Sequence, residues 1–89
     1  MKLGTSSKTA SLTFTVSDDV TQVIIYVAKY KTNTTKISIN GGAKQTINNA
    51  SNNGEYDAII VDTSTNKKVT LTTVSGGVRA MINTIEYYG

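Results

Sequence analysis

Period-two alternation of apolar and polar residues runs through most of this chain and constrains its fold more than any other feature. In residues 11–16, for example, Leu12, Phe14 and Val16 alternate with serine and threonine. Successive side chains of a β-strand point to opposite faces of a sheet, so this pattern predicts strands with one buried and one solvated face. No helical segment lies between the strand-like runs. The sequence therefore predicts an all-β protein.

Turn residues divide the alternating sequence into separate strands. The predicted strands cover residues 2–4, 11–16, 20–28, 36–40, 43–47, 55–62, 68–74 and 78–88. Residues 20–28 and 55–62 are apolar on both sides, and we expect residues 20–28 to be central in a sheet, with both faces partly covered. Asn40-Gly41 predicts a two-residue hairpin turn, because both residue types tolerate positive φ.

The last predicted strand contains two apolar pairs of opposite parity. Ala80 and Ile82 share one parity, while Ile85 and Tyr87 share the other. A β-bulge inserts one extra residue into a strand and so reverses the alternation. A bulge at about Asn83-Thr84 is therefore expected to place all four side chains on the core face.

About seven or eight strands, with turn signals about every eight to twelve residues, are typical of an antiparallel two-sheet β-sandwich. A closed barrel is the alternative fold for the same pattern. A chain of 89 residues makes one domain, with little core to spare in the absence of disulfides or metals. We therefore expect residues 1–89 to form a single β-sandwich module, and we expect this module to belong to a longer protein.

The composition argues against catalysis. The chain has no His, no Cys and no Trp, and only six acidic side chains. Histidine is the commonest general base and a common metal ligand, and cysteine thiolates supply the other frequent ligands of zinc. We therefore expect a protein that is not an enzyme and that uses no cofactor.

The pattern of charged and apolar residues restricts the classes of partner that this protein is expected to bind. Nine basic residues outnumber six acidic ones, giving a net charge of +3, but the basic residues are spread along the chain and include a single Arg. Surfaces that bind nucleic acid usually cluster their basic residues, so we expect no nucleic-acid partner. No apolar span of about 18 residues is present, so we expect no membrane insertion. Abundant Thr, Ser and Asn with a charged fraction of only 17% indicate an extracellular or cell-surface module.

Two pairs of carboxylates are candidates for a metal site. Asp18 and Asp19 are adjacent, while Glu55 and Asp57 are spaced to project from the same face of a strand. Calcium takes six or more oxygen ligands, usually from an Asp-rich loop that neither pair resembles. The favoured interpretations are a turn and a solvated strand edge, and calcium binding is the alternative.

Tyrosines are the available platforms for sugar rings, which stack on flat side chains. Tyr30 is the strongest candidate, because it stands in a polar loop with Asn33 and two lysines that can hydrogen-bond to sugar hydroxyls. The alternative is that each tyrosine buries its ring at a strand end and leaves its hydroxyl in water.

The doubly apolar strands predict a second kind of surface. If Ile24 and Tyr26 lie beside Tyr56 and Ile60 on the outer face of one sheet, they form an exposed apolar patch, which soluble monomers usually avoid. A neighbouring domain, a second copy of the chain or a further strand would then cover this patch. The alternative is that long Thr and Lys side chains on adjacent strands screen it.

Several strand sequences carry a resemblance to a known family. Val-Thr-Gln-Val-Ile-Ile-Tyr-Val-Ala in residues 20–28 follows an Asp-Asp turn, Ile-Ser-Ile-Asn-Gly-Gly occupies residues 37–42, and Met-Ile-Asn-Thr-Ile-Glu-Tyr-Tyr occupies residues 81–88. In these segments the chain resembles the small galactose-binding-like jelly rolls, similar to carbohydrate-binding modules, that bacteria attach to secreted hydrolases, nucleases and surface proteins. The resemblance covers most of the chain and rests on strand sequences without a chemical motif.

The resemblance implies a jelly-roll fold closed by the last strand. The apolar side chains that close the sandwich in the family correspond here to Ile82, Ile85 and Tyr87. The resemblance also implies a sugar site on loops at one end, where Tyr30 and Asn33 correspond and Arg79 adds a hydrogen-bond donor. The chain departs from the sugar-binding members in having no Trp.

We therefore expect a non-catalytic accessory module that binds carbohydrate or a cell-surface polysaccharide and holds an adjacent domain of the same protein near its substrate. The alternative function is a structural spacer, or a β-sandwich that assembles with itself or with another domain and has no small ligand. The outer apolar faces of residues 20–28 and 55–62 favour this alternative.

Overall fold

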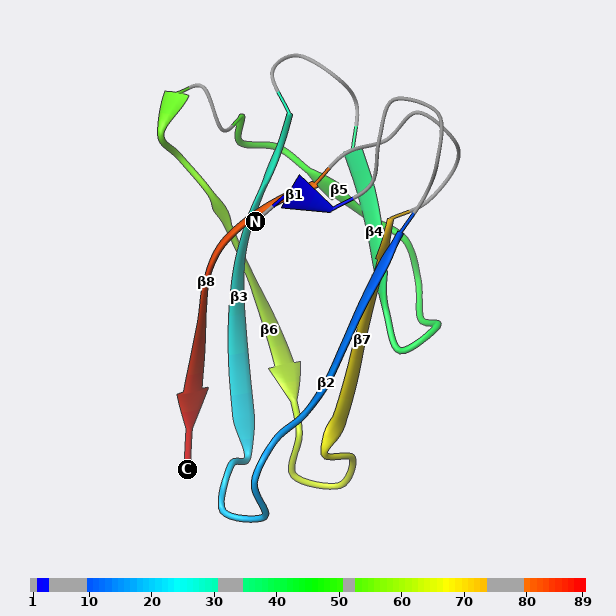
Figure 1. Ribbon diagram of the computed structural model, residues 1–89, viewed down its shortest axis with the longest axis vertical. Coiled ribbons are helices and arrows are strands. Elements are labelled where there is room, and N and C mark those ends of the chain that lie inside the picture. The colour runs from blue at the N-terminus through cyan, green and yellow to red at the C-terminus, as the bar shows by residue number, and fades with distance from the viewer. Residues whose placement is uncertain (1, 4–9, 31–34, 51–52, 74–79) are drawn as a thin grey trace.

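The computed structural model describes residues 2–3, 10–30, 35–50, 53–73 and 80–89. Within these residues the chain forms eight strands and no α-helix (Figure 1). The strands are β1 (Lys2–Leu3), β2 (Ser11–Thr15), β3 (Gln22–Lys29), β4 (Thr35–Ile39), β5 (Gln45–Ile47), β6 (Asp57–Asp62), β7 (Lys68–Thr73) and β8 (Ala80–Tyr88). The predicted all-β class is confirmed.

The strands form two antiparallel sheets that face one another (Figure 1). Sheet A has the strand order β1-β8-β3-β6, and sheet B has the order β2-β7-β4-β5. The prediction of two antiparallel sheets is confirmed. The barrel alternative is wrong for the described residues, because their strands separate into two sheets and do not close into one.

The strand pairs are nested around the middle of the chain. Strand β1 pairs with β8, β2 with β7, β3 with β6, and β4 with β5. The chain is therefore antiparallel to itself about the β4–β5 connection, as in one long hairpin. Two further pairings, β3 with β8 and β4 with β7, complete the two sheets. As a result, every connection between consecutive strands except β4–β5 passes from one sheet to the other.

The turn at the centre of this nested arrangement is the predicted Asn-Gly hairpin. Asn40 has a φ of 52° and Gly41 a φ of 75°, and Gly42 N donates to Ile39 O at 2.9 Å. Two successive residues with positive φ form a turn whose twist matches that of paired strands. Asn40 also joins the hairpin to β7, because Thr70 N donates to Asn40 Oδ1 at 2.8 Å.

The core lies between the inner faces of the two sheets. Alternate residues of β2, β3, β4, β6, β7 and β8 supply it, together with Ile47 of β5, as the alternating sequence predicts. Its buried members are Val16, Val23, Ile25, Val27, Ile37, Ile47, Ile59, Val61, Val69, Leu71, Ala80 and Ile82. Strand β3 lies between β8 and β6 in sheet A, so the predicted central position of this segment is confirmed.

The predicted bulge in the last strand is present. Tyr26 pairs with Thr84 and Val27 pairs with Ile82, so Asn83 is the extra residue on β8. The bulge places Ile82 in the core and lets Ile85 pack against it. Tyr87 shares this side but lies at the end of the sheet, where its side chain is 55% exposed and its ring meets Phe14 edge to face, with centroids 6.3 Å apart.

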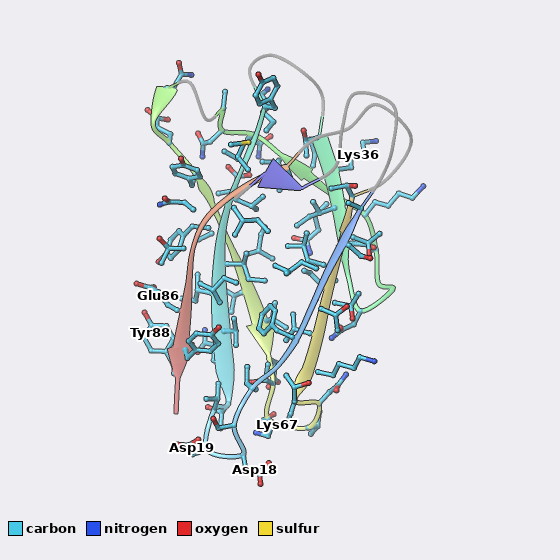
Figure 2. The ribbon with its side chains drawn as sticks, in the orientation of Figure 1. Asp18, Asp19, Lys36, Lys67, Glu86 and Tyr88 are labelled. Carbon is cyan, nitrogen blue, oxygen red and sulfur yellow. The ribbon has the colours of Figure 1, made fainter. Side chains whose placement is uncertain are left out.

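The β2–β3 turn is fastened to the β6–β7 loop at the lower end of the molecule in Figure 2, where Asp18, Asp19 and Lys67 are labelled. Val20 O accepts a hydrogen bond of 2.6 Å from Lys67 Nζ and one of 3.2 Å from Thr63 Oγ1. Thr63 N donates to Thr21 O at 2.9 Å. These contacts tie the connection between the sheets to the start of β3.

Three predicted strands begin later than expected, and one of them is the segment 43–47, which becomes a strand only at Gln45. The segment 20–28 becomes a strand only at Gln22, because the backbone of residues 20–21 bonds to the neighbouring loop and to Tyr88. The segment 55–62 becomes a strand at Asp57 and forms an edge of sheet A. The first two residues of the predicted last strand, 78 and 79, lie outside the described residues.

Candidate functional site

The structure describes one of the three predicted ligand residues. Tyr30 follows β3 directly, is half-buried and already has an interaction partner within the protein. Asn33 and Arg79 lie outside the described residues. The loop site that joins these three residues therefore stays a prediction.

The carboxylate of Asp57 is occupied by hydrogen-bond donors. Its Oδ2 accepts from Asn48 N at 2.9 Å, and its Oδ1 accepts from Asn49 N at 3.0 Å and from Asn49 Nδ2 at 2.6 Å. These bonds join the end of β5 to the start of β6, which gives Asp57 a structural role. In the described part of the chain, no three His, Cys, Asp or Glu side chains lie together as potential metal ligands.

The outer face of sheet A gathers aromatic, apolar and polar side chains across β8, β3 and β6. Residues paired across antiparallel strands lie on the same face, so the register defines three rows. Starting from the end of the sandwich that holds the C-terminus, the rows are Tyr88, Gln22 and Asp62; Glu86, Ile24 and Ile60; and Thr84, Tyr26 and Ala58. We call these nine residues the tyrosine face. With ordinary strand geometry it covers about 13 Å along the strands and about 10 Å across them.

Several members of the tyrosine face are open to solvent. Ile60 is 65% exposed and Tyr88 is 44% exposed, while Ile24 and Tyr26 are half-buried. The next outward position along β3, Ala28, is fully buried, so the exposed surface ends there. This confirms the expected juxtaposition of Ile24, Tyr26 and Ile60 on one outer face. Tyr56, the fourth expected member, precedes β6 and belongs to none of the paired rows.

Two tyrosines of this face meet at one carboxylate oxygen. Tyr26 Oη and Tyr88 Oη each donate a hydrogen bond of 2.8 Å to Glu86 Oε1. The bonds from Tyr88 and Tyr26 lower the pKa of Glu86, and the bond to Glu86 raises the pKa of each tyrosine. Figure 2 shows Glu86 and Tyr88 together on the outer side of β8. Each ring is thereby fixed by its hydroxyl.

A pocket of about 370 Å³ lies at the β6 side of the same face. It is lined by Thr21, Gln22, Ile60, Asp62 and Ser64. Asp62 Oδ1 accepts from Ser64 Oγ at 2.6 Å and from Ser64 N at 2.8 Å, and these two bonds lower the pKa of Asp62. The pocket is therefore bordered by an ionised carboxylate, an amide and an exposed apolar side chain.

A second pocket, of about 330 Å³, lies at the end of the sandwich beside the β2–β3 turn. Among its lining residues are Thr15, Asp19 and Tyr87. It offers one exposed aromatic ring beside one carboxylate. As a ligand-binding site it is a weaker candidate than the tyrosine face, where two aromatic rings and a carboxylate lie next to a pocket.

The outer face of sheet B has the opposite chemistry. Its described side chains are mostly hydroxyls, and we call them the hydroxyl face: Ser11, Thr13, Thr15, Ser38, Thr46, Thr70 and Thr72, with Lys36 and Lys68. Thr13 and Thr70 hydrogen-bond to each other through their hydroxyls at 3.2 Å. No aromatic side chain belongs to this face, so it has no platform for a sugar ring.

Sequence reasoning counted Tyr88 among the available tyrosine platforms without placing it on this face, and it missed Glu86. Glu86 and Tyr88 share a parity in the last strand, which is a signal that they lie on one side. Their position beside Ile24 and Gln22 depends on the β3–β8 register, which follows from tertiary pairing. The sequence alone therefore could not place them with Tyr26.

Comparison with protein-family models, with curated proteins and with solved structures found no match for this chain. Within the described residues, no helix has the length and apolar character needed to cross a membrane.

Proposed function

We propose that this protein is a non-catalytic jelly-roll module that binds a glycan on its tyrosine face. The strand order supports the jelly-roll assignment. A jelly roll has eight strands in two sheets joined by Greek-key connections, and the nested pairs and sheet-to-sheet crossings described above suit that arrangement. The resemblance of the strand sequences to galactose-binding-like modules points the same way.

The observation that carries the proposed function is the meeting of Tyr26 and Tyr88 at Glu86 on an exposed sheet face. A sugar presents apolar C–H faces and polar hydroxyl edges. Rigid tyrosine rings suit the first, and carboxylate and amide groups suit the second. Ile60 extends the apolar surface toward the pocket beside Asp62. The tyrosine face thus offers apolar surface for the C–H faces of a sugar and polar groups for its hydroxyl edges.

The role proposed for this face is binding without chemistry. Glu86 and Asp62 are its carboxylates, and they lie on β8 and β6, on either side of β3. Glycosidases enclose a scissile bond between two carboxyl groups in a cleft. On the tyrosine face, the two carboxylates border an open surface, where they can accept hydrogen bonds from sugar hydroxyls.

The setting that we propose is extracellular or at a cell surface, with the module holding an adjacent domain of the same protein near a polysaccharide. The hydroxyl-rich, weakly charged composition supports this setting. Neither a nucleic-acid partner nor insertion into a membrane is part of the proposal.

Affinity measurements on three variants test the proposal. Titration calorimetry with soluble neutral polysaccharides is expected to give saturable binding by the wild type and a loss of about tenfold or more in Tyr88→Ala. Thr72→Ala, on the opposite face, is the matched control and should bind like the wild type. Tyr30→Ala separates the loop site from the tyrosine face. If Tyr30→Ala abolishes binding while Tyr88→Ala leaves it intact, the site is on the loop and the tyrosine face is excluded.

A second candidate function is self-assembly, with a second copy of the chain covering the same face. The observation that favours it is the exposure of Ile60, which is 65% accessible beside Ile24. Sedimentation at increasing protein concentration tests it. Assembly through this face predicts that the wild type forms a dimer and that the Ile60→Lys variant is monomeric. A wild type that remains monomeric at high concentration rules it out.

A further inference from the structure

We infer that the tyrosine face selects uncharged glycans and rejects glycans that carry carboxylate, sulfate or phosphate groups. This inference rests on the proposed function and specifies its ligand class. It follows from the hydrogen-bonding groups that the face leaves available and from the way charge is divided between the two sides of the sandwich.

The strongest donors of the face are already used. The phenolic protons of Tyr26 and Tyr88 both point to Glu86 Oε1. A neutral phenol has one proton to donate, so neither hydroxyl can donate to a ligand without giving up Glu86. An anionic ligand group needs donors. On this face it meets two phenols whose protons are committed to a carboxylate.

The acceptors, by contrast, remain available. Glu86 Oε2 accepts no hydrogen bond from another described residue, since both tyrosines bond to Oε1. Asp62 Oδ2 is likewise unused by the described residues, since Ser64 bonds twice to Oδ1. An ionised carboxylate only accepts hydrogen bonds. The matching ligand is therefore one that supplies hydroxyl protons, as a neutral sugar does.

The negative charge of the tyrosine face also disfavours anionic ligands. Among its described residues the tyrosine face carries the carboxylates of Glu86 and Asp62 and no Lys or Arg. Lys67 of the β6–β7 loop interacts electrostatically with Asp62, but its Nζ already donates a hydrogen bond to Val20 O. The hydrogen bonds lower the pKa of both groups, so both are ionised at neutral pH. Like charges brought together at a binding surface oppose binding strongly. A uronate, sulfate or phosphate on the ligand would meet these two charges.

The positive net charge of the whole protein would suggest a preference for anionic glycans, but the charges are unevenly distributed over the two sheets. The total is +3, but Lys36 and Lys68 belong to the hydroxyl face, which has no Asp or Glu among its described residues. In sheet A, the strand position of Lys2 falls in the row of Ala28 and Met81, beyond the three rows of the tyrosine face. The hydroxyl face thus offers a polyanion cations without carboxylates, whereas the tyrosine face offers carboxylates without cations. The two sides of the sandwich thus separate neutral from anionic ligands.

Matched polymers that differ only in charge test the inference. Suitable pairs are hydroxyethylcellulose with carboxymethylcellulose, and carboxyl-reduced polygalacturonate with polygalacturonate. Amide shifts of isotope-labelled protein report which face each polymer contacts. The expected result is that the neutral member of a pair shifts Glu86, Tyr88 and Ile60, with an affinity at least about tenfold above that of the anionic member for this face.

Two variants make the test specific to charge. Asp62→Asn combined with Glu86→Gln removes both charges at constant shape and should reduce the neutral-over-anionic preference about tenfold. Thr84→Lys adds a cation at an exposed position beside Tyr26 and should raise anionic binding on this face. Equal shifts from both members of a pair, or a preference that neither variant changes, overturn the inference alone. No shift on the tyrosine face with any of the polymers overturns the proposed function as well.

Discussion

Tyr26 Oη donates a hydrogen bond of 2.8 Å to Glu86 Oε1 across the β3–β8 pair, although the two residues are 60 positions apart in the sequence. Tyr88, two residues beyond Glu86, donates to the same oxygen at 2.8 Å. The carboxylate thus links the centre of sheet A to the last strand. This link is both the proposed anchor of the binding surface and a source of pH-dependent stability.

The Glu86 cluster predicts how stability changes with pH. The pKa of Glu86 is lower in the folded protein than in the unfolded chain, because Tyr88 and Tyr26 donate to the ionised form. Its contribution is therefore present above the unfolded pKa, about 4.3, and is lost as pH falls through the folded pKa. The tyrosine pKa values are raised, so their contribution is present below the unfolded pKa, about 10, and is lost as pH rises further.

Thermal unfolding of the wild type and Glu86→Gln across the pH range isolates this effect. The stability advantage of the wild type is expected near neutral pH and should shrink below about pH 4 and above about pH 10. An advantage that stays constant across the whole range would contradict the assigned hydrogen bonds.

Substitution by alanine is predicted to destabilise the protein strongly at Ile25 and only weakly at Ile60. Ile25 lies in β3 and is fully buried, whereas Ile60 on the adjacent strand is 65% exposed. Ile25→Ala should lower the free energy of unfolding by about 2–5 kcal/mol, because it leaves a cavity in a small core. Ile60→Ala should change it by about 0.5 kcal/mol or less. Chemical denaturation measures both losses, and similar losses would mean that the inward and outward sides of sheet A are misassigned.

Lys67 is predicted to stabilise the β2–β3 turn through one hydrogen bond. Its Nζ donates to Val20 O at 2.6 Å, whereas the neighbouring Lys68 is exposed on the outer face. Lys67→Met keeps the aliphatic stem and removes the donor, which should reduce the free energy of unfolding by about 1–2 kcal/mol. Lys68→Met is the control and should have little effect. Equal effects of the two substitutions would argue that the contact contributes nothing beyond general charge.

The carboxylate of Asp57 is predicted to stabilise the β5–β6 connection. Asp57→Asn replaces one acceptor oxygen with a donor that faces N–H groups of Asn48 or Asn49, so we expect a loss of about 1–3 kcal/mol in the free energy of unfolding. Glu55→Gln, at an exposed position on the same segment, is the control.

Calcium provides a further check of the structural role of Asp57. An increase in melting temperature with calcium that Asp57→Asn removes would show that the carboxylate binds metal instead.

Much of the fold could be predicted from local sequence. Alternation located the strands, the Asn40-Gly41 dipeptide located the central turn, and the parity change after Ile82 located the bulge. These features are set within a few residues of the chain. Strand starts were less accurate, because Val20 is held by Lys67 and Thr63 from a distant loop and does not join the ladder.

The candidate site was less predictable, because it depends on pairing between distant strands. The double apolar pattern predicted an outer patch of Ile24, Tyr26, Tyr56 and Ile60, and all of these except Tyr56 lie in the paired rows. Glu86 joins that patch only through the β3–β8 register, and the bulge at Asn83 sets this register. The loop site at Tyr30 was inferred from a polar neighbourhood and a family resemblance, neither of which specifies three-dimensional contacts.

The most direct test of the central claim is an amide-resolved NMR titration of the isotope-labelled protein with soluble neutral polysaccharides. Binding on the tyrosine face predicts saturable shifts clustered at Tyr26, Ile60, Glu86 and Tyr88, with no comparable change on the hydroxyl face. Saturable shifts that avoid these four residues and centre on Tyr30 or on sheet B would contradict it.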